Sequence, residues 1–237
     1  MPISSSPDHV AVAVPSIPEA AMRWCDGFGG AWCSPKHSEG SGFATQQLWY
    51  RGGAKLELLE PETDDGFAAG FLKRFGARVH HVTLKVPDLS TAVEVVRDAG
   101  YDVVDVNTDL EEWHEGFLRP SQVGGAIVQL ARSELSVEDW AKMLGFTPEP
   151  LPTIGPALHG PTLYHPDLDA CARVWTVLGG TVERDDEVVR VSWPDSPLTV
   201  QVERREDIDP PVLRFTGGPR VAADPRLGPA TVTDSLR

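Results

Sequence analysis

Two stretches decide the fold: DHVAVAVPSI at residues 8–17 and HHVTLKVPDL at residues 80–89. Both begin with strand-like alternation and end in Val-Pro, then a polar residue and an aliphatic one. The second stretch follows the first at a shift of 72 residues, which superposes His9 on His81. A repeat at a fixed spacing indicates two copies of one structural unit.

The same shift extends through the rest of both copies. It lays AKLELLEP (54–61) over AIVQLARS (126–133), so that Glu57 falls on Gln129 with aliphatic residues on either side. The prediction is therefore a tandem arrangement in which each copy supplies one histidine and one polar residue near its end.

Each copy predicts a strand, a helix and three further short strands. The first strands span 8–14 and 79–86, and the helices span 17–28 and 89–99, with apolar residues at helical spacing. We therefore predict an α+β fold made of tandem βαβββ modules.

The four repeated polar residues fall on one face of the predicted sheet. Successive residues of a strand point to opposite faces, so His9 points away from the neighbouring valines and Glu57 away from the neighbouring leucines. The repeat puts His81 and Gln129 on the same surface. Two imidazoles, one carboxylate and one amide oxygen form a donor set for one divalent metal, namely Zn, Ni, Co, Mn or Fe(II).

Beyond these copies the composition changes. We expect a paired βαβββ domain over 1–132, a capped helix and proline-rich linker over 133–158, a third βαβββ module over 159–206, and an irregular tail over 207–237.

The third module is shortened, and Gly160 stands where the first two copies have their histidine. We therefore predict that it binds no metal and packs beside the paired modules. It would shield apolar residues, namely Trp175, Val177, Val191 and Trp193. A homodimer built on this module is also plausible, because pairing covers open sheet edges.

Composition excludes several classes of partner. The 237-residue chain has a formal net charge of -14 and no basic run, which disfavours nucleic acid and anionic membranes as partners. Three cysteines without CxxC spacing argue against disulfides and thiolate metal sites, and no apolar stretch predicts insertion into a membrane. The expectation is a cytoplasmic protein that acts on a small-molecule substrate.

The quoted segments, together with FLKRFGARVHHVTLKVPD (71–88) and FLRPSQVGGAIVQLA (117–131), resemble the vicinal oxygen chelate superfamily. That superfamily includes glyoxalase I, extradiol dioxygenases, bleomycin-resistance proteins and methylmalonyl-CoA epimerases, and the likeness is strongest to the epimerases. The resemblance implies a cup of eight strands. It places the family's metal ligands at four positions, His9, Glu57, His81 and Gln129.

Two departures bear on the reaction that the resemblance implies. The family's last ligand is normally a glutamate, whereas Gln129 stands here, and the stretch that would hold an acidic base offers only Gln46 and Gln47. Neutral amides cannot accept a substrate proton as a base. The loop DLEEWHEG (109–116) supplies replacement candidates for proton transfer: His114, Glu115 and Glu112.

The function expected first is a metal-dependent lyase or isomerase. It would act on a small oxygenated or acyl-thioester substrate through metal-stabilised enediolate chemistry. One alternative is a non-haem Fe(II) dioxygenase, because two histidines and one carboxylate also suit that metal. Another is a non-catalytic small-molecule binding protein of the resistance type.

Overall fold

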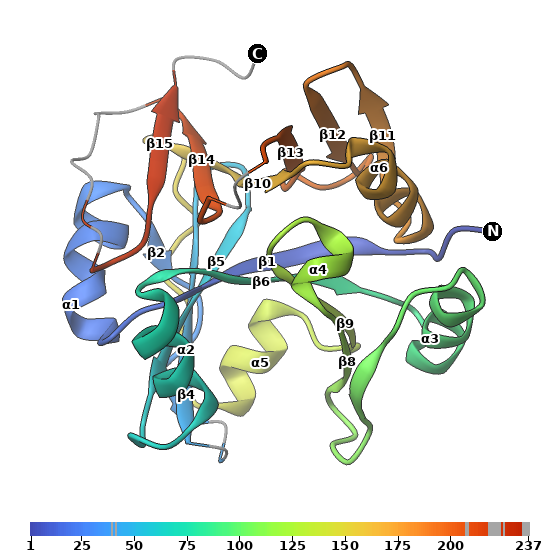
Figure 1. The fold of residues 1–237 in the computed structure, drawn as a ribbon. Coiled ribbons are helices and arrows are strands. Elements are labelled where there is room, and N and C mark those ends of the chain that lie inside the picture. The colour runs from blue at the N-terminus through green and yellow to red at the C-terminus, as the bar shows by residue number, and fades with distance from the viewer. Residues whose placement is uncertain (39, 41, 207–208, 218–223, 225, 234–237) are drawn as a thin grey trace. The chain divides into compact units, whose positions relative to one another are not determined.

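The computed structural model of the chain describes residues 1–38, 40, 42–206, 209–217, 224 and 226–233. Its strands form two sheets accompanied by few helices, which is the mixed α+β architecture expected of βαβββ modules (Figure 1). The three modules predicted from the sequence are present within it.

The chain forms two compact units, each assembled from separate segments. Unit 1 comprises Met1–His9, His81–Glu134 and Gly160–Pro211, and unit 2 comprises Val10–His80, Leu135–His159 and Val212–Arg237. Three strands pass from one unit to the other along the chain: β1 (Ser6–Ala13), β6 (Arg78–Lys85) and β10 (Ala157–His165).

Unit 2 contains most of the first copy. Its strands are β2 (Ala31–Trp32), β3 (His37–Ser38), β4 (Phe43–Trp49) and β5 (Lys55–Pro61). Their hydrogen-bonded order is β2-β4-β5-β1, with β3 also on β4. The predicted helix over 17–28 is α1 (Ile17–Ala21) followed by a π-helical segment, η1 (Met22–Gly27).

Unit 2 contains two more helices, of which the second is the capped helix predicted within 133–158. The helix α2 (Phe67–Phe75) joins the first two copies along the chain. The helix α5 (Val137–Met143) begins with a capping box, in which Ser136 and Asp139 satisfy each other's backbone N–H groups.

The C-terminal segment was predicted to be irregular, but it contains two strands. Strands β14 (Val212–Thr216) and β15 (Ala230–Thr233) pair in parallel. The Phe215 ring of β14 packs in unit 2 against the rings of Phe28, Tyr50 and Trp24, at centroid distances of 4.4, 5.2 and 6.3 Å. Burial of this ring and the pairing with β15 both stabilise the short strand.

Unit 1 contains the rest of the second copy and most of the third. The second copy has α3 (Leu89–Asp98), β7 (Val104–Asn107), β8 (His114–Leu118), α4 (Pro120–Val123) and β9 (Ile127–Arg132). The third copy has α6 (Leu168–Val177), β11 (Thr181–Arg184), β12 (Val188–Ser192) and β13 (Val200–Arg204). Asp88 and Asp167 accept backbone hydrogen bonds at the starts of α3 and α6, which explains where both helices begin.

The second and third copies share one strand order within unit 1. Their orders in the sheet are β6-β9-β8-β7 and β10-β13-β12-β11. In each copy the strand that comes first along the chain pairs in parallel with the one that comes last, β6 with β9 and β10 with β13. Thr83 lies beside Gln129 in the second copy, and Thr162 lies beside Gln201 in the third. The third copy therefore keeps the threonine-glutamine pair of the second.

At Gly160, however, the third copy has a backbone that excludes the repeated histidine. Its φ is +101°, and a Cβ built there would lie 2.2 Å from the Thr199 carbonyl oxygen. Elsewhere the copy is well packed: Trp175 and Trp193 are buried, and Trp175 Nε1 donates to the Val123 carbonyl at 3.1 Å.

Neither thiol chemistry nor a membrane helix is evident in the described residues. Cys25 and Cys171 are free thiols, and burial raises the pKa of each to about 12, so these two stay protonated at neutral pH. None of the described helices is both long enough and apolar enough to cross a bilayer.

Candidate metal centre

The two repeated histidines lie together in unit 1. His9 of β1 and His81 of β6 are both buried, with 2% and 6% of their surface exposed. Their rings meet edge to face, with centroids 5.5 Å apart. Two buried imidazoles at this separation can share one ion.

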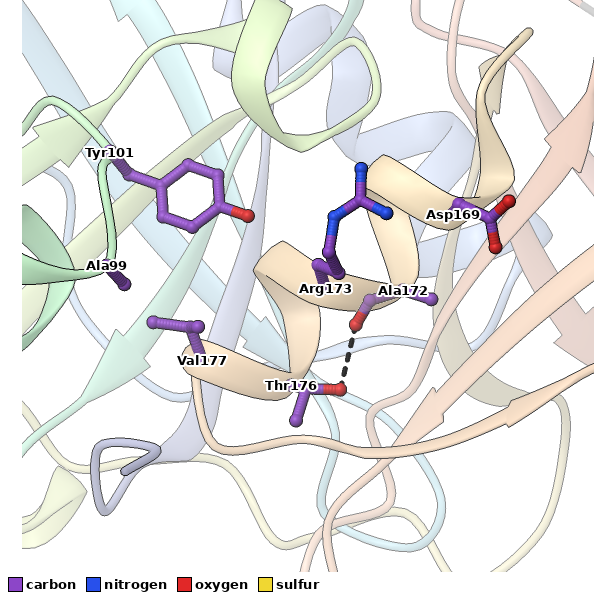
Figure 2. A pocket seen from close by; sticks show the side chains of 7 residues that line it. All are labelled: Ala99, Tyr101, Asp169, Ala172, Arg173, Thr176 and Val177. Atoms are coloured by element: carbon purple, nitrogen blue, oxygen red, sulfur yellow. Dashed lines mark hydrogen bonds between the residues drawn. The ribbon is translucent and has the colours of Figure 1, made fainter.

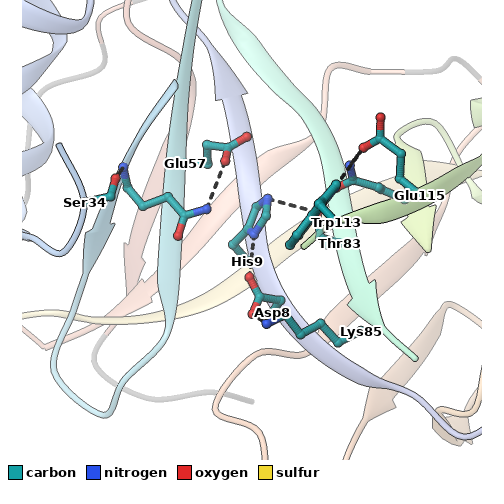
Figure 3. Close-up of polar contacts among 10 residues, drawn as sticks. Asp8, His9, Ser34, Glu57, Thr83, Lys85, Trp113 and Glu115 are labelled. Carbon is teal, nitrogen blue, oxygen red and sulfur yellow. Dashed lines mark hydrogen bonds and ion pairs between the residues drawn. The ribbon is translucent and has the colours of Figure 1, made fainter. Parts of the chain in front are cut away.

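Asp8 fixes the orientation of the first histidine. Its carboxylate Oδ2 lies 2.7 Å from His9 Nδ1, and its other oxygen lies 3.7 Å from Lys85 Nζ (Figure 3). A carboxylate can only accept a hydrogen bond, so Nδ1 carries the hydrogen and Nε2 is left as the nitrogen that can bind a metal.

A series of polar contacts leads from His9 to the candidate base, and the hydrogen bonds in it begin at the Thr83 hydroxyl. His9 Nε2 lies 3.0 Å from Thr83 Oγ1, and the Thr83 hydroxyl donates to Gln129 Oε1 at 2.5 Å. Gln129 Nε2 donates to Glu115 Oε2 at 2.7 Å, and Trp113 Nε1 donates to the same oxygen at 3.0 Å. The amide oxygen of Gln129 thus lies on the side of the histidines, and its nitrogen on the side of Glu115.

The carboxylate of the first copy completes a ligand group. The candidate ligand atoms of His9, Glu57 and His81 all lie within 4.8 Å of one another, and all three residues are buried. Gln47 of the neighbouring strand β4 donates through Nε2 to Glu57 Oε2 at 3.0 Å.

This donor set suits a divalent metal. Ligand atoms held about 2.0–2.2 Å from an ion lie at most roughly 4.4 Å from one another, so small side-chain movements would bring the three atoms to bonding distance. Two neutral nitrogens and a carboxylate oxygen favour Zn and its first-row neighbours, and Gln129 Oε1 offers a further oxygen.

The three predicted proton-transfer residues have different surroundings. Glu115 belongs to the hydrogen-bond chain described above. His114 precedes it on β8 and pairs with Arg132, so strand alternation turns its side chain to the opposite face. Glu112 is exposed in the bend before β8. Glu115 is therefore the only one of the three that shares the face of Gln129.

His80, adjacent to a candidate ligand, packs into the aromatic core of unit 2. Its ring packs against Phe71 and Phe67 of α2, at centroid distances of 4.7 and 5.7 Å. Burial lowers the pKa of His80 to about 4, so the ring is neutral at physiological pH.

A surface groove in unit 1 has fewer side chains that could bind a metal or transfer a proton than the cluster of His9, Glu57 and His81 has. It is lined by seven residues, Ala99, Tyr101, Asp169, Ala172, Arg173, Thr176 and Val177 (Figure 2). The Thr176 hydroxyl donates to the Ala172 carbonyl, and Asp169 pairs with Arg184. Some polar groups of the groove are thus already bonded to other parts of the protein. None of the residues that line it belongs to the cluster of His9, Glu57 and His81.

The sequence reasoning missed Asp8, Thr83 and Trp113. Strand alternation was a usable signal for Thr83, which stands two residues after His81 on the same face. Asp8 and Trp113 gave no such signal, because their contacts depend on side-chain direction at a strand end and in a loop.

Comparison with known proteins identifies the family to which this chain belongs. Residues 8–117 match the family model described as Glyoxalase/Bleomycin resistance protein/Dioxygenase superfamily. Mitochondrial methylmalonyl-CoA epimerase from Bos taurus is 30% identical over 129 residues, covering 53% of this chain and 73% of that protein. The chain belongs to the glyoxalase/bleomycin resistance/dioxygenase superfamily. Metal binding within this superfamily is consistent with the histidine and glutamate group.

Two solved structures share the fold over more of the chain. A hypothetical protein from Staphylococcus aureus has a TM-score of 0.67 at 10% identity, covering 98% of this chain and 99% of its own. A mutant of 4-hydroxymandelate synthase from Streptomyces coelicolor has a TM-score of 0.61 at 16% identity, covering 92% and 72%. At these identities the likeness shows the fold alone.

Proposed function

We propose that this superfamily member is a metal-dependent isomerase or lyase that acts on a small oxygenated or acyl-thioester substrate. The observation that carries the proposal is the buried group of His9, Glu57 and His81, whose ligand atoms lie within 4.8 Å of one another. The relative named methylmalonyl-CoA epimerase supports the acyl-thioester class.

Four residues would hold the metal: His9, Glu57, His81 and, through its amide oxygen, Gln129. A divalent cation bound there would act as a Lewis acid toward the oxygens of the substrate. The four side chains are themselves buried, which strengthens local electrostatic interactions at the metal position.

Glu115 would accept the substrate proton. Its Oε2 holds the hydrogen bonds from Trp113 and Gln129, whereas Oε1 has no hydrogen-bond partner in the described part of the chain. The C–H bond beside the substrate carbonyl breaks, its electron pair moves toward the carbonyl oxygen, and the proton passes to Oε1. In a substrate that carries an oxygen on that carbon, transfer of the proton from Oε1 to the former carbonyl carbon would complete an isomerisation without any redox change, whereas its return to the same face of the first carbon regenerates the substrate.

Metal content tests the ligand assignment. Protein purified without added metal is expected to hold one divalent ion per chain by elemental analysis, and His81→Ala should lose it. Gln129→Ala should weaken binding less than His81→Ala, because a neutral amide is the weaker donor. Wild-type protein that binds no metal would contradict the proposal and favour a non-catalytic binding protein.

Isotope exchange tests the reaction. The probe is methylmalonyl-CoA in D₂O. With Glu115 as the single base, deuterium should replace the α-proton much faster than the configuration of the α-carbon inverts. Inversion is slower because it needs proton-transferring groups on both faces of that carbon. Glu115→Gln should reduce exchange by about 10²–10⁴-fold, whereas Glu112→Gln should not. Inversion as fast as exchange would contradict a single base.

A second candidate function is an Fe(II) dioxygenase. The same two histidines and one carboxylate form the donor set of such enzymes. Proton exchange that continues under argon would favour the isomerase or lyase, whereas a reaction that occurs only with O₂ would favour the dioxygenase.

A further inference from the structure

Each of the first two copies contains a hydrogen-bonded pair of one amide and one carboxylate side chain on neighbouring strands. The order of the amide and the carboxylate along the chain is reversed between the two copies. In the first copy the amide is on the earlier strand: Gln47 of β4 donates to Glu57 of β5 at 3.0 Å. In the second copy the carboxylate is on the earlier strand: Gln129 of β9 donates to Glu115 of β8 at 2.7 Å. The repeat superposes Glu57 on Gln129, so the second copy has its carboxylate on the neighbouring strand instead.

The second pair decides which end of the Gln129 amide faces the histidines. A glutamine side chain offers a donating nitrogen and an accepting oxygen, and rotation by half a turn exchanges them. A carboxylate cannot donate, so Glu115 holds the nitrogen. The oxygen is thereby directed to Thr83, whose hydroxyl donates to it at 2.5 Å and lies 3.0 Å from His9 Nε2.

Trp113 strengthens this arrangement. Its indole N–H donates to Glu115 Oε2 at 3.0 Å, the same oxygen that accepts from Gln129. The carboxylate is therefore held from two directions, and the more exposed neighbour Glu112 makes no comparable contact among the described residues.

We propose that Glu115, besides accepting the substrate proton through Oε1, positions a ligand of the metal centre through Oε2: it turns Gln129 into an oxygen ligand and supplies the negative charge that a glutamate at position 129 would have carried. This inference rests on the proposed function, because it assumes that the histidine group binds a divalent cation. Outer groups that orient metal ligands commonly change metal affinity by about 10–100-fold when they are removed.

Zinc titration of the full chain, in competition with a chromophoric chelator, tests the inference. Glu115→Gln should weaken Zn²⁺ binding by about 10–100-fold, because a glutamine there can donate as well as accept and no longer selects one amide orientation. Glu112→Gln removes the same charge from the exposed loop and should leave the affinity unchanged. Zinc binding that is indifferent to Glu115→Gln would overturn the inference, whereas no zinc binding by the wild-type protein would contradict the proposed function.

A double-mutant cycle on the metal-free protein tests the pair without any metal. Gln129→Glu should lower the midpoint of thermal unfolding when Glu115 is present, since two carboxylates would then lie at hydrogen-bond distance. In the Glu115→Gln background the same substitution recreates one amide and one carboxylate, in the order of the first copy, and should lower the midpoint little or not at all. An equal shift in both backgrounds would show that the two side chains are not coupled and would overturn the inference.

Discussion

At the residue scale, Asp8 acts on the candidate metal centre through its neighbour. Its side chain is 12% exposed, and its carboxylate accepts from His9 Nδ1 at 2.7 Å. This contact selects the ring nitrogen that stays available for a metal. Loss of the carboxylate should therefore alter metal binding although Asp8 need not touch the ion.

We predict that Asp8→Asn lowers zinc affinity by about 10–100-fold, which a chelator competition titration would measure. An asparagine can present its NH₂ group to Nδ1, which would move the ring hydrogen to Nε2 and block ligation. The matched control is Asp98→Asn, which removes one negative charge from an exposed position in the same unit. Equal affinities for Asp8→Asn and wild type would show that His9 is oriented by other contacts.

His80 predicts a pH dependence of stability. Its folded-state pKa of about 4 lies below the unfolded value of about 6.5, so the unfolded chain binds the proton more readily between these values. The free energy of unfolding should therefore fall as pH drops from about 6.5 toward 4, by at most on the order of 3 kcal/mol from this residue.

The measurement is urea unfolding of wild type and His80→Leu across that pH range. The variant should lose part of the slope of stability against pH, because it has no group to titrate there. As a control, Phe71→Leu alters the same aromatic contacts but should keep the slope. An unchanged slope in His80→Leu would place the titration elsewhere.

The repeat was enough to predict that His9, Glu57 and His81 lie close together. It could not rank the residues of the 109–116 loop, because the register of β8 was unknown from the sequence. Once Glu115 is opposite Ala131, alternation directs Glu115 toward Gln129 and His114 away from it. The choice between neighbouring proton-transfer candidates thus depended on strand register.

At the scale of elements, the short strand β14 packs within unit 2 through one aromatic side chain. Phe215 is fully buried in unit 2 and contacts the rings of Phe28 and Tyr50. The helices α5, α3 and α6 each start at a residue type that commonly caps a helix, namely Ser136, Asp88 and Asp167. The two C-terminal strands were not predictable, because four or five residues among prolines and glycines carry too little periodicity.

We predict that Phe215→Ala destabilises the protein by about 3–5 kcal/mol, the usual cost of emptying a buried aromatic site. Guanidinium unfolding followed by tryptophan fluorescence would report it, since Trp24 lies in the same cluster. The control is Ile154→Ala, an exposed site in unit 2, which should change stability by less than about 0.5 kcal/mol. A loss below about 1 kcal/mol for Phe215→Ala would mean that β14 contributes little to folding.

At the scale of the whole molecule, each compact unit combines segments that are far apart in the sequence. Unit 1 joins the second copy to the third through contacts such as Trp175 with Val123, and unit 2 joins the first copy to the C-terminal strands. The sequence predicted the modules but not this grouping, because no periodicity reports which modules share a core.

We predict that a fragment ending at residue 134 does not fold as a soluble, cooperative unit. It would lack Gly160–Pro211 from unit 1 and Phe215 from unit 2, leaving apolar surface uncovered in both. Light scattering with thermal unfolding would test this, and the same measurement on the full chain tests the predicted homodimer. A monodisperse fragment with one sharp transition would show that 1–134 is self-sufficient.

The backbone at Gly160 has a consequence for how this protein could change. Because a Cβ there would lie 2.2 Å from the Thr199 carbonyl, no single substitution can place a histidine at this position of the third module without moving the chain around it. The third module therefore cannot gain that ligand in one step, although Thr162 and Gln201 lie side by side. An engineer who wants a second metal site here would have to rebuild the Thr199 segment first.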